Sequence, residues 1–114
     1  MRYIKDDTEF REIYKTGRSV ADRNIVLYAL KGRDDESPAM GVSVGKKYGN
    51  SVERHLFKRR FKEIARAEEP RMIKGVRLVV LARKDASEVF SDLESSFRKL
   101  AAKLKIYGSG EDRL

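Results

Sequence analysis

The chain has 114 residues, with 26 lysines and arginines against 18 aspartates and glutamates, a formal net charge of +8. This length predicts a single domain, over residues 1–107, with a frayed tail at 108–114, and the charge favours a polyanionic partner such as nucleic acid. Cysteine is absent, which excludes disulfides and thiolate metal sites, and no apolar run approaches membrane-spanning length. We therefore expect a cytoplasmic protein with no membrane partner.

The first element expected along the chain is a short helix. Asp7 or Thr8 can cap it, Phe10, Ile13 and Tyr14 follow helical spacing, and Gly17 is placed to end it. The apolar spacing indicates that this helix packs against the rest of the domain with one side.

Two strands are expected next. Residues 25–30 are rich in β-branched and aromatic side chains, and residues 40–44 alternate well enough to have one buried face. The polar segment 31–38 between them predicts a turn or loop, and its acidic residues are best interpreted as solvated. A short additional strand at 18–21 is compatible with the sequence.

The second half predicts a helix, a strand and a helix. Asn50 and Glu53 have the spacing of a capping box, so a helix should run from there to about Ala67, before Pro70. Residues 76–82 are the most apolar run and predict a central strand. A last helix should start near Ser87, with an apolar face formed by Phe90, Leu93, Phe97, Leu100 and Leu104.

The expected order is therefore α-β-β-α-β-α, with the strand at 18–21 as an option. This order gives an α/β fold of the α+β sandwich type, built on a small central sheet.

Basic residues concentrate in the helix that starts near Asn50 and in the loop before it. Residues 46–66 contain eight basic and two acidic residues, a net +6 of the chain's +8. At about 100° per residue, six side chains fall within an arc of roughly 140°. These six form what we call the basic stripe: Arg54, His55, Lys58, Arg59, Lys62 and Arg66.

The stripe has two interpretations. A charged helix face is most often simply solvated, but here almost no acidic residue is interleaved, so like charges four residues apart repel each other. This repulsion destabilises the helix unless a partner of opposite charge is bound. The arrangement therefore favours nucleic-acid binding. The other side of the helix, expected to pack on the sheet, carries five apolar residues and one basic one: Val52, Leu56, Phe57, Phe61, Ile64 and Arg60.

Three parts of the sequence resemble the bacterial ribonuclease P protein family. Residues 45–63, GKKYGNSVERHLFKRRFKE, resemble the family signature K-K-x-G-N-A-V-x-R-N-x-x-K-R-x-x-R-E. Residues 10–23 resemble its F-x-x-x-F/Y-x-x-G-K/R-S…R pattern, and residues 75–83 its G-x-x-x-V-V-x-A-R strand. The likeness is collinear over about nine tenths of the chain. It departs at Ser51, which replaces Ala, at His55, which replaces Asn, at Arg60, where an apolar residue is usual, and at Lys62, which replaces Arg.

The resemblance implies a protein that assists a catalytic RNA in removing the 5′ leader of precursor tRNA. In such a complex the RNA performs the hydrolysis with Mg²⁺ that it largely binds itself, and the protein supplies affinity and positioning. It also implies a left-handed βαβ crossover, against the general preference for right-handed ones.

The resemblance further implies two binding surfaces on different faces of the domain. The expected RNA-subunit surface comprises Lys46, Lys47, Asn50, Arg54, His55, Lys58, Arg59, Lys62 and Arg66. The expected leader surface lies at a cleft between the sheet and the first helix, and it comprises Phe10, Tyr14, Arg18, Ser19 and Arg23. The two aromatic rings can stack on unpaired bases, but core packing of an amphipathic helix is the alternative.

We expect no catalytic or metal-binding residues in the chain itself. His55 is the only histidine, and no second group supplies an acid and base pair or a two-metal site. The main alternative is a structural RNA-binding module such as a ribosomal protein, and a stand-alone metal-dependent hydrolase is a second. A DNA partner is not expected.

Overall fold

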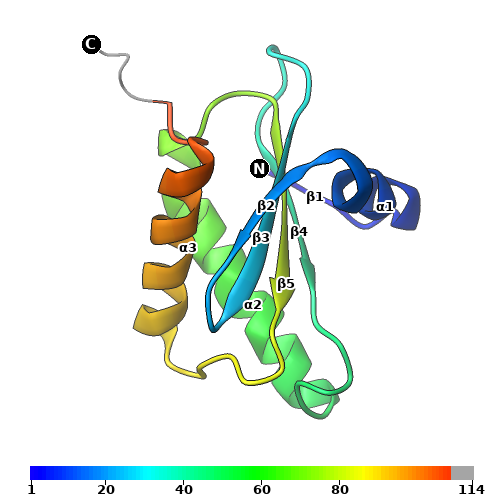
Figure 1. Ribbon diagram of the computed structural model, residues 1–114, viewed down its shortest axis with the longest axis vertical. Helices are drawn as coiled ribbons and strands as arrows, with labels where there is room; N and C mark the ends of the chain where they lie inside the picture. Colours follow the sequence, from blue (N-terminus) through cyan, green and yellow to red (C-terminus); the bar gives the residue numbers. More distant parts are fainter. Residues whose placement is uncertain (109–114) are drawn as a thin grey trace.

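The computed structural model describes residues 1–108 and has a mixed α+β fold with one five-stranded sheet and three helices (Figure 1). The elements in chain order are β1 (Arg2–Tyr3), α1 (Asp7–Thr16), β2 (Arg18–Ala21), β3 (Ile25–Lys31), β4 (Ala39–Ser43), α2 (Ser51–Glu68), the short 3₁₀ helix η1 (Glu69–Arg71), β5 (Val76–Ala82) and α3 (Phe90–Leu104). The expected fold class, the helices and the optional strand at 18–21 are thereby confirmed.

The strand order in the sheet is β1-β4-β5-β3-β2. β5 occupies the centre, as its apolar run predicted, parallel to β4 and antiparallel to β3. The expected order lacked β1, which pairs parallel with β4 over only two residues. Two residues are too few to show the period-two alternation of a strand. β4, α2 and β5 form the expected βαβ unit, and its handedness stays a prediction.

The sheet is covered on both faces (Figure 1). α2 and α3 pack on one face, where Phe57, Phe61 and Phe97 are fully buried against residues of β3 and β5. α1 packs on the other face, where Ile13 contacts Val79 in a smaller cluster. Burial on both faces explains why β5 is apolar throughout most of its length.

The apolar side of α2 differs from the expected one. Phe57, Phe61 and Ile64 are buried, but Val52 is 75% exposed and Leu56 is 39% exposed. At 100° per residue, Val52 and Leu56 lie about 140° and about 100° around the helix from Phe57. The prediction that these two residues pack on the sheet is therefore wrong, because residues so far around the helix cannot contact the same sheet face.

Several elements begin at residues other than those predicted. Asp6, not Asp7 or Thr8, caps α1 by accepting the Thr8 N–H, and Gly17 follows its last residue as predicted. α3 begins at Phe90 rather than near Ser87, because the Ser87 hydroxyl accepts the Val89 N–H in a turn that precedes the helix. Phe90 is consequently 37% exposed, whereas the other four predicted apolar residues of α3 are buried.

The expected frayed tail falls almost wholly on residues 109–114, outside the described residues. Gly108, the one tail residue described, donates its N–H to the Arg71 carbonyl at 2.7 Å.

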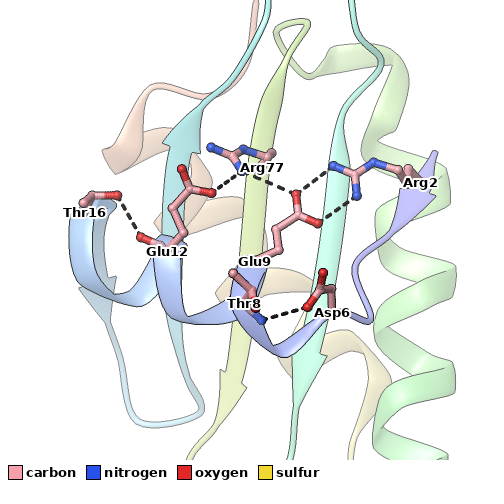
Figure 2. A network of polar contacts seen from close by, with 7 residues as sticks. All are labelled: Arg2, Asp6, Thr8, Glu9, Glu12, Thr16 and Arg77. Atoms are coloured by element: carbon pink, nitrogen blue, oxygen red, sulfur yellow. Dashed lines mark hydrogen bonds and ion pairs between the residues drawn. The ribbon is translucent and has the colours of Figure 1, made fainter.

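Ion pairs attach α1 to the sheet (Figure 2). Arg77, which projects from β5 on this face, donates to Glu12 at 2.8 Å and to Glu9 at 3.4 Å. The two terminal nitrogens of Arg2 in β1 donate hydrogen bonds to the two Glu9 carboxylate oxygens, at 2.9 and 2.8 Å. Glu9 thus connects the helix to an edge strand and to the central strand, which fixes how α1 lies across the sheet.

These contacts change the acidity of Glu9. The hydrogen bond from Arg2 lowers the pKa of Glu9; burial opposes this shift, and Arg77 adds to it. A carboxylate with a lowered pKa stabilises the fold above its unfolded pKa, and the stabilisation is lost as the pH falls through the folded pKa.

We therefore predict that Glu9→Gln lowers the free energy of unfolding at pH 7 by about 1 kcal/mol. The difference from the parent should narrow as the pH falls through the lowered pKa of Glu9, where the carboxylate of the parent becomes protonated. Chemical denaturation followed by circular dichroism at several pH values measures both effects. Asp34→Asn, in an exposed pair with Lys31, is the matched control and should change little. Equal stability of Glu9→Gln and the parent at pH 7, or a difference that persists at low pH, would contradict this account.

Candidate nucleic-acid interface

A groove of about 710 Å³ runs between α1, β4 and α2, and we call it the α1–α2 groove. Its lining residues come from three separate stretches of the chain, 3–14, 42–44 and 55–62: Tyr3, Ile4, Lys5, Asp7, Phe10, Arg11, Tyr14, Val42, Ser43, Val44, His55, Lys58 and Lys62. The wall formed by α1 carries the aromatic rings, with the cations Lys5 and Arg11 nearby, and the wall formed by α2 carries His55, Lys58 and Lys62.

The aromatic wall belongs to α1. Phe10 and Tyr14 are half-buried, with ring centroids 6.2 Å apart, and Tyr14 meets the Tyr28 ring edge to face at 4.9 Å. The Phe10 ring lies over Gly41 of β4, where a Cβ atom would come within 2.5 Å of the ring. Both rings thus pack in the smaller core and also line the groove, so core packing and base stacking are compatible for these two residues.

The cationic wall belongs to α2. His55, Lys58 and Lys62 are exposed on the side of the helix that faces the groove. The Lys62 ammonium lies 5.2 Å from the centre of the Tyr3 ring, a cation–π distance that connects this wall to β1.

The two expected surfaces therefore meet at the α1–α2 groove. Three residues assigned to the RNA-subunit surface, His55, Lys58 and Lys62, share the groove with Phe10 and Tyr14 of the leader surface. Sequence reasoning assigned them by family motif, and motif membership does not report which segments fold next to each other.

The remaining members of the RNA-subunit surface divide into free cations and structural groups. Lys46, Lys47, Arg59 and Arg66 are exposed, and no hydrogen bond or ion pair of these side chains is found within residues 1–108. The side chains of Asn50 and Arg54 instead make hydrogen bonds to the backbone at the start of α2.

Asn50 caps α2. Its side-chain oxygen accepts the Glu53 N–H at 2.8 Å, and the Glu53 carboxylate accepts the Asn50 N–H at 2.9 Å, which confirms the predicted capping box. Arg54 is partly buried and donates to the Gly49 carbonyl at 2.8 Å, so it supports the loop that carries Lys46 and Lys47. Both side chains organise the entrance to α2 whether or not they also contact a ligand.

Three members of the leader surface lie outside the groove. Arg18 donates to the Leu104 carbonyl at 2.7 Å, at the end of α3 on the other side of the sheet. Ser19 pairs with Tyr28 across β2 and β3 and so shares the face of α1 without lining the groove. Arg23 lines a separate hollow. The structure does not bring these three residues together with Phe10 and Tyr14.

Sequence reasoning missed several cations that accompany these sites. Lys5 and Arg11 line the α1–α2 groove, and Arg83 and Lys84 line the hollow that contains Arg23. Arg11 follows Asp7 by four residues and precedes Tyr14 by three, so helical spacing could have placed it beside the rings. Arg83 lies near Arg23 because of strand pairing, and no pattern in the local sequence indicates this proximity.

Within residues 1–108, no three histidine, cysteine, aspartate or glutamate residues gather closely enough to hold a metal ion. Over the same range, no helix is both long and apolar enough to cross a bilayer.

Comparison with known proteins identifies the family. The family model described as Ribonuclease P matches residues 2–105. The chain belongs to the ribonuclease P protein family. The ribonuclease P protein component of Clostridium botulinum is 40% identical over 106 residues, 91% of this chain and 95% of that protein. The component from Clostridioides difficile is 37% identical over 107 residues, 90% of this chain and 91% of that protein.

Solved structures of the family have the same fold. The RNase P protein of Staphylococcus aureus aligns with a TM-score of 0.86 at 28% identity, over 95% of this chain and 99% of its own. The RNase P protein of Thermotoga maritima aligns with a TM-score of 0.79 at 25% identity, over 95% and 100% of the two chains. Family membership confirms the resemblance. It does not agree with the two alternatives, a ribosomal protein and a stand-alone hydrolase.

The exposed cations of the basic stripe should bind phosphates by displacing counterions. We predict that Lys58→Ala combined with Arg59→Ala weakens binding to a bacterial ribonuclease P RNA about tenfold or more and reduces the slope of log affinity against log salt by about 1 to 2. These two residues are chosen over Arg54 because its loss would also release the loop at Gly49. Filter binding at several salt concentrations provides the measurement.

Lys103→Ala removes an exposed lysine from α3 and serves as the control. It should leave both affinity and slope nearly unchanged. If the double variant keeps the parent's affinity and salt slope with its fold intact, the stripe is only a solvated helix face.

Proposed function

We propose that this chain is the protein subunit of ribonuclease P that binds the catalytic RNA and the single-stranded 5′ leader of precursor tRNA. In this proposal the RNA cleaves the phosphodiester with Mg²⁺ that it largely holds, and the chain supplies binding and positioning but no catalytic group. The observation that carries the proposal is the α1–α2 groove, in which the aromatic wall of α1 faces the cationic wall of α2.

This combination of groups suits an unpaired strand of RNA. Unpaired bases expose π-faces that can stack on aromatic rings, whereas bases inside a duplex are already stacked. The strand's phosphates need cations at the same time, and Lys58 and Lys62 stand across the groove from Phe10 and Tyr14. A duplex would offer only its phosphates to such a groove.

The arrangement also supports a division of labour along α2. Lys58, Lys62 and His55 face the groove, while Arg59 lies about 100° around the helix from Lys58, and Lys46 and Lys47 project from the preceding loop. One helix can therefore contact the leader with one flank and the structured RNA subunit with the other. Such a helix would place the two RNAs next to each other, which is a positioning role.

We predict that Phe10→Leu with Tyr14→Leu weakens binding of precursor tRNA to the reconstituted complex by about 5- to 150-fold for each ring that stacks, because stacking contributes about 1 to 3 kcal/mol per ring. Leucine keeps apolar volume for the smaller core and removes the planar ring. Binding of mature tRNA, which has no leader, should be unchanged. The measurement is a pair of dissociation constants, with leader and without.

Tyr28→Leu is the matched control. The Tyr28 ring packs on Tyr14 but does not line the groove, so its loss tests the effect of disturbed packing alone. Equal losses for precursor and mature tRNA, or an equal loss in Tyr28→Leu, would assign Phe10 and Tyr14 to the core only.

A further inference from the structure

Two apolar side chains are exposed on the outer side of α2. Val52 is 75% exposed and Leu56 is 39% exposed, and they follow each other by one helical turn. Together with Ser51, His55 and Arg59 they form a shallow hollow of about 460 Å³. Among residues 1–108, Val52 is the most exposed large apolar side chain.

The position of this pair relates it to the basic stripe. Going around the helix at 100° per residue, Val52 lies about 20° beyond Arg59 and Leu56 about 60° beyond it. The pair therefore borders the stripe along the flank that faces away from the α1–α2 groove. A ligand bound through Arg59 and His55 would reach Val52 and Leu56 as well.

The charge around the pair favours one class of occupant. A second copy of this chain, docked through the same surface, would bring one basic stripe against another, and like charges oppose that contact. Two aliphatic side chains also provide far less than the roughly 800 Å² per partner of a stable interface. A polyanion that also exposes apolar faces matches both features, and RNA with unpaired bases is such a ligand.

We propose that Val52 and Leu56 contact an unpaired nucleobase of the RNA that α2 binds, while Arg59 holds an adjoining phosphate. This inference rests on the proposed function, since it assumes that α2 binds the RNA subunit. It adds a contact to a base, whereas the cations contact only the backbone. Contacts to phosphates alone carry no information about the base sequence.

Val52→Ala is the informative variant. The side chain is mostly exposed and alanine has the higher helix propensity, so the fold should be retained. Leu56→Ala is a second variant of the same pair, but it also disturbs a hollow that Leu56 shares with Tyr48 and Arg60. The test of the proposal therefore depends on Val52. Val89→Ala is the matched control, because Val89 is 55% exposed and precedes α3.

Affinity for a bacterial ribonuclease P RNA is measured at several salt concentrations, and affinity for inorganic polyphosphate, a polyanion without bases, is measured in parallel. We expect Val52→Ala to bind the RNA about 3- to 10-fold more weakly. The slope of log affinity against log salt should be unchanged, because no charge is removed. Affinity for polyphosphate should also be unchanged, and Val89→Ala should resemble the parent in every measurement.

Three results would overturn the proposal. RNA affinity of Val52→Ala equal to that of Val89→Ala would show that Val52 makes no specific contact. An equal loss for RNA and polyphosphate would show that the change acts through the cations. A parent dimer in sedimentation that Val52→Ala dissociates, with RNA affinity retained, would identify a protein interface. Failure of the proposed function is distinguishable, since the parent itself would then not bind the RNA.

Discussion

The packing of Phe57 and Phe61 against the sheet is the constraint on which the interface depends. Both rings are fully buried, with centroids 5.0 Å apart, and Phe61 also meets Phe97 of α3 at 6.4 Å. These contacts fix the rotation of α2 about its axis, because moving the rings out of the core would cost several kcal/mol. The cations of α2 are exposed as a consequence: with this side buried, Lys58, Lys62, Arg59 and Arg66 must face solvent or a ligand.

The groove depends on a second, independent packing arrangement on the opposite face of the sheet. Ile13 and Val79 anchor α1 there, and the ion pairs of Glu9 hold the helix at its angle across the strands (Figure 2). The aromatic wall is thus set by one core and the cationic wall by another. β4 lies between them and contributes Val42, Ser43 and Val44 to the floor. A single rigid sheet can therefore present rings and cations at a constant separation.

Local patterns predicted most of the fold and part of the interface. Capping by Asn50, the helical spacing of Phe97 and Leu100, and the apolar run of β5 all act within a few residues, so the sequence displays them. The stripe on α2 is predictable for the same reason.

Val52 and Leu56 were misassigned because helical spacing shows which residues share a face but not how wide a face the sheet covers. The contribution of α2 to the groove was missed because the two helices that line it are some forty residues apart along the chain. The contact of Arg18 with Leu104 joins residues separated still further. Such approaches are decided by how whole elements pack, which no short sequence window contains.

We propose that this chain positions RNA for cleavage and does not cleave it. The most direct test combines the purified protein with a bacterial ribonuclease P RNA and follows precursor-tRNA cleavage over a series of Mg²⁺ concentrations. We predict that the two together remove the 5′ leader at a lower Mg²⁺ concentration than the RNA alone requires, and that the protein alone leaves the substrate intact. Cleavage by nuclease-free protein without the RNA, or an unchanged Mg²⁺ requirement in its presence, would contradict the account.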